Sequence, residues 1–147
     1  LLIAASFLVE AQTVPLKSAA WGNVGVLCND SDQLIPLDGT GNWKAPPAAP
    51  GAGTFPASSD LTIRKVCLTH IINGAPTNSY AVVGHSGVNG DHISPYVFGS
   101  GTQCLSYEKD AAVIFSAGDY LDVHTRCDSS VPGSNYWIIL QVWYTQP

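Results

Sequence analysis

Apolar and polar residues alternate in short runs along most of the chain, which is the pattern of β-strands rather than of helices. In the first segment the apolar side chains of one strand face are those of Leu1, Ile3, Ala5, Phe7 and Val9. This alternation predicts a half-buried strand over Leu1–Val14 that ends at Pro15.

Further strands are expected where β-branched and aromatic residues recur between Gly, Pro and Asn turn signals. The expected strands are Trp21–Cys28, Leu34–Leu37, Leu61–Ile72, Tyr80–Val83, Ile93–Phe98, Gln103–Tyr107, Ala112–Phe115, Tyr120–Thr125 and Tyr136–Tyr144. The parity of the apolar residues changes near Arg64 and Lys65, which predicts a β-bulge there. Asn73-Gly74 predicts a turn directly after this strand.

The segment Gly39–Pro56 is rich in Pro and Gly and predicts a loop or an extended arm. We therefore divide the chain into an N-terminal arm with its connection, residues 1–53, and a β-domain, residues 54–147. Short strands at this spacing, without a helix-period segment, predict an all-β fold. The expected architecture is an antiparallel β-sandwich or jelly roll with an extended N-terminal arm.

The last expected strand, Tyr136–Tyr144, is apolar or aromatic on both parities. One face is expected to pack on the core, and the second also needs cover. The cover is either another segment of the same chain or a second subunit, since aromatic residues are enriched in interface cores. The candidate interface residues are Leu1, Ile3, Phe7, Val9, Trp43, Tyr136, Trp137, Ile139 and Trp143.

The composition supports buried subunit contacts. Only 12% of the 147 residues are charged, against a usual quarter, while 46% are hydrophobic. This balance argues against an intrinsically disordered chain, and six basic residues with a net charge of −5 argue against nucleic acid as a partner. No run of 18 apolar residues predicts a membrane helix. The sequence contains no Met, so Leu1 is not expected to be the translation start.

Four widely spaced cysteines, Cys28, Cys67, Cys104 and Cys127, form no CxxC motif, so no zinc site is expected. Free buried thiols are the preferred interpretation. Two disulfides are the alternative if the chain matures in an oxidising compartment.

No recognised catalytic motif occurs, and we predict no catalytic residue, metal or cofactor. The candidate general bases are His70, His85, His92 and His124, and each is expected to be a structural or loop residue. A secreted carbohydrate-binding β-sandwich or an extracellular filament subunit is the alternative function. Its candidate aromatic residues are Trp21, Trp43, Tyr96 and Trp143.

The segments Thr54–Thr69, Tyr80–Val83 and Phe115–Val123 resemble a β-domain of tailed-phage virion proteins. The region Thr54–Tyr144 is also similar to tumour-necrosis-factor-like jelly rolls, which commonly form trimers. The resemblance implies a non-enzymatic decoration, cement or fibre-type protein at the virion surface. It implies a homotrimer that contacts a major capsid or other virion protein, with neither nucleic acid nor membrane as partner, and it assigns no catalytic residue.

Overall fold

The computed structural model describes residues 14–22, 26–28, 32–36, 60–85, 93–108, 113–116 and 121–146, and of residues 32–36, Phe115 and Asp122 only the backbone. Within these ranges the chain forms strands and no helix. The strands are β1 (Leu16–Gly22), β2 (Val26–Leu27), β3 (Asp32–Pro36), β4 (Leu61–Asn73), β5 (Asn78–His85), β6 (Val97–Phe98), β7 (Gly101–Ser106), β8 (Val113–Phe115), β9 (Leu121–Asp128) and β10 (Asn135–Thr145).

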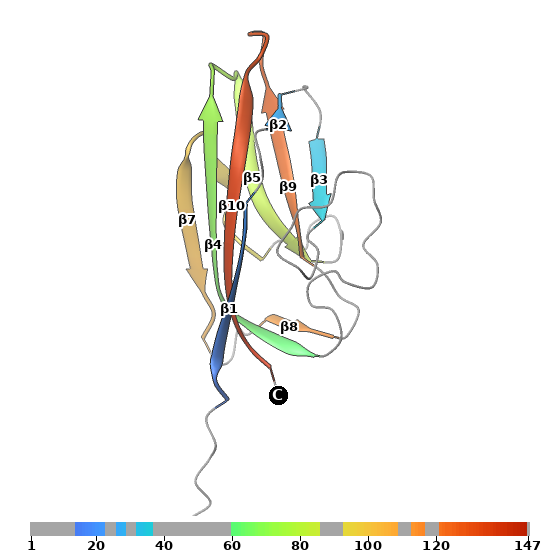
Figure 1. The fold of residues 1–147 in the computed structure, drawn as a ribbon, viewed down its shortest axis with the longest axis vertical. Helices are drawn as coiled ribbons and strands as arrows, with labels where there is room; N and C mark the ends of the chain where they lie inside the picture. The colour runs from blue at the N-terminus through green and yellow to red at the C-terminus, as the bar shows by residue number, and fades with distance from the viewer. Residues whose placement is uncertain are drawn as a thin grey trace, which may run out of the picture.

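The strands form two sheets that pack face to face (Figure 1). Sheet A has the order β1-β10-β4-β7, with β2 paired to β10 and β8 paired to β4. Sheet B has the order β3-β9-β5-β6. Every described strand pair is antiparallel.

The connections between the strands identify the architecture. The chain passes from sheet A to sheet B between β4 and β5, and returns between β6 and β7. It crosses again before β9 and once more before β10, so the central strands β10, β4 and β9 are flanked by strands that do not directly precede or follow them in the chain. This interleaving of two antiparallel sheets is that of a jelly roll, which confirms the predicted all-β fold class.

The core lies between the sheets and follows from alternation along each strand. Its largest fully buried apolar side chains come mainly from two neighbouring strands, at Leu61, Ile63, Leu68, Leu121, Ile138 and Leu140. Each such side chain contributes about 1.5–3 kcal/mol when removed from water. The three central strands β4, β10 and β9 therefore hold most of the core.

The β-bulge predicted near Arg64 is confirmed. Lys65 lies opposite Trp143 while Ile63 lies opposite Tyr144, so Arg64 has no register partner. The extra residue resets the parity, and both Ile63 and Val66 consequently point into the core. The turn at Asn73-Gly74 is also confirmed, because Gly74 has the positive φ of 109° that favours glycine.

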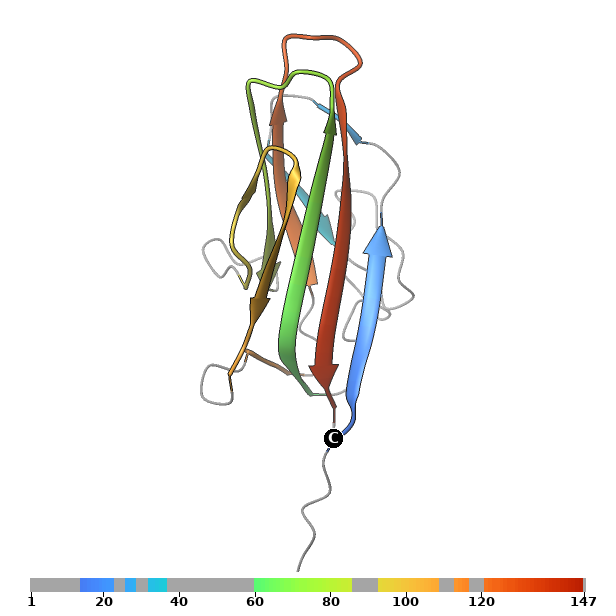
Figure 2. The same ribbon diagram turned by 90° about the vertical axis from the view of Figure 1, so that its left-hand side faces the viewer.

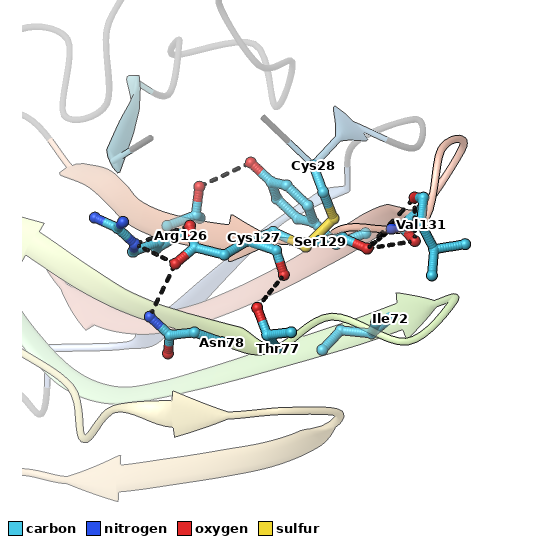
Figure 3. Close-up of a disulfide and its surroundings, with 12 residues drawn as sticks. Cys28, Ile72, Thr77, Asn78, Arg126, Cys127, Ser129 and Val131 are labelled. Atoms are coloured by element: carbon cyan, nitrogen blue, oxygen red, sulfur yellow. Dashed lines mark hydrogen bonds and ion pairs between the residues drawn. A yellow bond between two sulfur atoms is a disulfide. The ribbon is translucent and has the colours of Figure 1, made fainter. Parts of the chain in front are cut away.

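The preferred interpretation of the cysteines as free thiols is wrong. Cys28 is bonded to Cys127 and Cys67 to Cys104, and the described chain has no free cysteine. The first disulfide links the segment after β2 to β9 and so joins the two sheets near one end of the sandwich (Figure 3). The second lies within sheet A, where its cysteines are register partners on β4 and β7.

The expected strands differ from the observed ones in their bounds, and two of them differ most. The run Ile93–Phe98 forms a strand only at Val97–Phe98, because the chain before Pro95 makes single hydrogen bonds to β5 instead of a ladder. The strand β1 begins at Leu16, earlier than the expected Trp21.

The expected strand Leu1–Val14 lies outside the described residues except for Val14, and the segment Gly39–Pro56 lies wholly outside them. The division at residues 53 and 54 stays a prediction. Within the described part of the chain, β1 and β3 belong to the same two sheets as the strands after residue 60.

Candidate assembly face

The outer face of sheet A is the surface of β1, β10, β4 and β7 that points away from sheet B. Alternation along β10 defines it: Ile138, Leu140 and Val142 are buried, whereas the residues between them point outward. Figure 2 shows these four strands lying side by side on the side that faces the viewer.

Register places the outward side chains of the four strands in rows. From β1 to β7 the rows are Ser18–Trp143–Lys65–Ser106, Ala20–Gln141–Cys67–Cys104 and Gly22–Ile139–Thr69–Thr102, followed by Trp137–Ile71 on β10 and β4. Small, uncharged polar and apolar residues fill almost every position. Among these residues Lys65 carries the only charge.

The charge of Lys65 lies against an aromatic ring. Its Nζ is 4.9 Å from the centroid of the Trp143 ring, within cation–π range. The indole therefore partly replaces water around the ammonium group. This arrangement lowers the cost of covering Lys65 with another apolar surface, because less hydration remains to be lost.

A side-chain hydrogen bond and a disulfide hold the edge strand β7 against β4. Thr69 and Thr102 are register partners whose hydroxyls lie 2.8 Å apart and share a hydrogen bond. In the neighbouring row Cys67 and Cys104 are joined covalently, with Cα atoms 4.1 Å apart. Together they fix the side chains of two strands in one rigid surface, so little ordering entropy is lost if this surface binds a partner.

Apolar side chains in the middle of this face remain in contact with water. Ile139 is 44% exposed at the centre of β10, and its neighbour Ile71 is also exposed. Trp137 and Trp143 are partly buried at either end. A central strand usually directs its solvent-facing positions to polar residues, so this apolar row is unusual for a surface that stays wet.

The structure locates four of the nine predicted interface residues. Trp137, Ile139 and Trp143 lie together on the outer face of sheet A. Tyr136 does not, because it is only 1% exposed and belongs to the core. The residues Leu1, Ile3, Phe7, Val9 and Trp43 lie outside the described part of the chain.

The interior position of Tyr136 explains why it is not an interface residue. Its hydroxyl lies 2.8 Å from the Thr125 hydroxyl of sheet B, with which it shares a hydrogen bond. Burial raises the pKa of Tyr136, so the phenol stays protonated. Its ring also meets His70 edge to face, with centroids 5.4 Å apart. The polar atoms of this side chain therefore serve the contact between the two sheets.

The three described histidines lie on three different strands, His70 on β4, His85 on β5 and His124 on β9. His70 is fully buried, and neither ring nitrogen has a partner in hydrogen-bond geometry. Burial lowers the pKa of His70, and the nearby Gly99 backbone offsets this shift only in part. His85 and His124 lie on the neighbouring strands β5 and β9, and His92 lies outside the described residues. His70 is therefore a neutral core residue.

Other candidate chemistry is sparse among the described residues. In the part of the chain that the structure describes, no three His, Cys, Asp or Glu residues are grouped so as to hold a metal ion. A search of the same residues finds no helix of the length and hydropathy needed to cross a membrane. Burial raises the pKa of Tyr107 to about 12, and its hydroxyl donates to the carbonyl of Ile93.

Comparison with known proteins gives a weak likeness among solved structures. No protein-family model and no curated protein matches the chain. Among solved structures, the chain is similar to the cryo-EM structure of the extra small virus (XSV) VLP of the giant freshwater prawn Macrobrachium rosenbergii. The sequences are 13% identical, the match covers 97% of this chain and 89% of the viral one, and the TM-score is 0.37. At this TM-score the likeness supports no functional argument.

Proposed function

We propose that this chain is a non-enzymatic structural protein of a virus particle and that it assembles by burying the outer face of sheet A. The observation that carries the proposal is the composition of that face, where the aligned rows of four strands contain one charge and several exposed apolar side chains. The jelly roll supports the proposal because viral capsid domains use it, although lectin domains use it as well.

The finer proposal is a protein that decorates or cements the capsid, or forms a surface fibre. It follows from the resemblance of Thr54–Tyr144 to tailed-phage virion β-domains and to trimeric jelly rolls. We propose a homotrimer that contacts a major capsid or other virion protein, located at the virion surface. A secreted carbohydrate-binding or filament protein is the competing function.

The outer face of sheet A is smaller than the area that a stable protein interface usually buries. Four strands about 4.8 Å apart and seven residues about 3.4 Å long each cover a projected area of about 450 Å². A standard interface buries about 800 Å² of accessible surface per partner. We therefore propose that the part of residues 1–53 outside the strands β1, β2 and β3 adds contact area by wrapping a neighbour, as extended segments do when they add to a sheet edge.

Sedimentation equilibrium tests the assembly. The subunit mass is 15.5 kDa, so a trimer has three times that mass. Ile139→Lys places a buried charge at the centre of the proposed contact and should shift the species towards monomer. Val131→Lys is the matched control, because Val131 is an exposed apolar residue in the turn between β9 and β10, away from the face.

The two variants separate assembly from folding. We expect both to unfold at the wild-type temperature, because both side chains are exposed, and only Ile139→Lys to lose the oligomer. A wild-type chain that stays monomeric at high concentration would overturn the proposal. Equal masses for wild type and Ile139→Lys would show that the contact, if any, uses another surface.

A further inference from the structure

Three aromatic side chains gather on the outer face of sheet B, far from the candidate assembly face. Tyr80 on β5 and Phe98 on β6 are register partners, with ring centroids 6.4 Å apart. Tyr96 stacks on Phe98 at 5.6 Å with an interplanar angle of 15°, and meets Tyr80 edge to face at 5.4 Å. We call these three residues the aromatic cluster.

The aromatic cluster is open to solvent although it contains large rings. Phe98 is 70% exposed and Tyr96 is 40% exposed. Alternation along β5 shows that the cluster is not core, because Ala81 and its inward neighbours fill the interior while Tyr80 points away from it. The mutual ring contacts hold the three side chains in one geometry, so a ligand would meet a preformed aromatic surface.

Polar groups continue the same surface along β9. Tyr80 is the register partner of Arg126, and Asn78 is the partner of Asp128. The Arg126 Nε donates to both carboxylate oxygens of Asp128 at 2.9 Å, and the Asn78 amide donates to that carboxylate at 3.3 Å (Figure 3). Arg126 and Asp128 are partly buried and Asn78 is exposed, so all three side chains are accessible from solvent.

We propose that the aromatic cluster and the neighbouring Asn78–Arg126–Asp128 group bind an uncharged sugar ring. A pyranose has one face of C–H groups with partial positive charge, which is attracted to the negative face of an aromatic ring. Its rim carries hydroxyls that both donate and accept hydrogen bonds. A carboxylate, a guanidinium and an amide beside an aromatic surface provide complementary acceptors and donors.

The charge of the group favours a neutral ligand over an ion. The Arg126 guanidinium and the Asp128 carboxylate are paired with each other, so this pair offers no net charge to a phosphate, a sulfate or a cation. A purely apolar protein partner would leave this ion pair covered without new hydrogen bonds, which costs free energy. The proposal does not depend on the assembly, because sheets A and B present opposite faces of the sandwich.

The test is binding of the full chain to a glycan array, followed by titration with the neutral monosaccharide of the best ligand while the aromatic NMR signals are observed. We expect a Kd of about 1 mM or tighter for one or more neutral glycans. Phe98→Leu keeps an apolar side chain but removes the ring, and should weaken binding about tenfold. Phe98→Tyr keeps an aromatic ring at this position and should retain binding.

A matched control is Ile114→Leu, because Ile114 is 67% exposed and lies on β8 of the other sheet. Its binding should equal that of the wild type. Absence of binding to every neutral glycan, or binding confined to anionic glycans, would overturn the proposal. Equal binding by wild type and Phe98→Leu would also overturn it, because the ligand would then use another surface. Capture of a protein partner that Phe98→Leu abolishes, without any sugar binding, would assign the cluster to protein contact instead.

Discussion

The Tyr136 and Thr125 hydroxyls meet between the two sheets, 2.8 Å apart, and each is buried. This hydrogen bond joins β10 of sheet A to β9 of sheet B within the core. Removing one partner leaves the other buried without its bond, which costs about 1–3 kcal/mol. We therefore expect Tyr136→Phe to lower the free energy of unfolding by that amount.

Urea unfolding of a double-mutant cycle measures the coupling free energy between the Tyr136 and Thr125 hydroxyls. Thr125→Val alone should also destabilise the protein, whereas Tyr136→Phe with Thr125→Val should cost less than the sum of the single changes. Additive losses would show that the two hydroxyls are not coupled in solution.

The two disulfides should contribute unequally to stability. Cys28–Cys127 closes a loop of sequence separation 99, and Cys67–Cys104 one of 37. The chain-entropy model gives about 4.7 kcal/mol for the first and about 3.8 kcal/mol for the second. Urea unfolding of the paired Cys→Ser variants should therefore show the larger loss for Cys28 with Cys127, and the reverse order would contradict this expectation.

Stability should fall in mild acid because of His70. Burial lowers the pKa of this imidazole in the folded state below its usual 6.5, so protons bind more readily to the unfolded chain. Its contribution is fully present above pH 6.5 and is lost as the pH falls through the folded-state pKa. Unfolding should need less urea at pH 5 than at pH 7.5.

His70→Phe provides the control for this pH dependence, since it keeps a ring beside Tyr136 and removes the titrating group. The difference in unfolding free energy between the two pH values should be smaller in the variant. The other histidines are present in both proteins, so an unchanged difference would assign the pH dependence to them or to the termini.

A comparison of Gly74 with Gly133 distinguishes two effects of replacing a turn glycine, which are backbone strain and a steric clash. Both have positive φ, 109° and 82°, so an alanine at either position is strained by about 1–3 kcal/mol. A Cβ at Gly74 would also lie 2.4 Å from Ser134 Oγ, whereas at Gly133 it meets nothing within 4 Å. Gly74→Ala should lower the melting temperature more than Gly133→Ala, and similar losses would refute the role of Ser134.

Local sequence patterns were sufficient to predict a structural feature where a single residue decides the backbone geometry. The bulge at Arg64 was predictable because it changes the parity of apolar residues within one strand. The turn at Gly74 was predictable because few residues tolerate its backbone conformation. The apolar run also predicted the strand β10, but the sequence could not say which of the two faces of this strand packs inward, since both are apolar. Tyr136 was therefore placed wrongly on the interface.

Features that depend on register between distant strands were not predictable. The Cys67–Cys104 bond requires that β4 and β7 pair with these two residues opposite each other. The aromatic cluster was missed for the same reason: Tyr96 was a candidate by itself, but only the pairing of β5 with β6 places Tyr80 beside Phe98. The outer face of sheet A likewise appears only when four strands are aligned.

A cryo-EM reconstruction of the native assembled particle tests the central claim most directly. The account predicts that another protein chain covers the outer face of sheet A, with Trp137, Ile139 and Trp143 buried against it. It also predicts that the aromatic cluster on sheet B, with Phe98, remains open to solvent. A particle in which the outer face of sheet A is in contact with water would contradict the account.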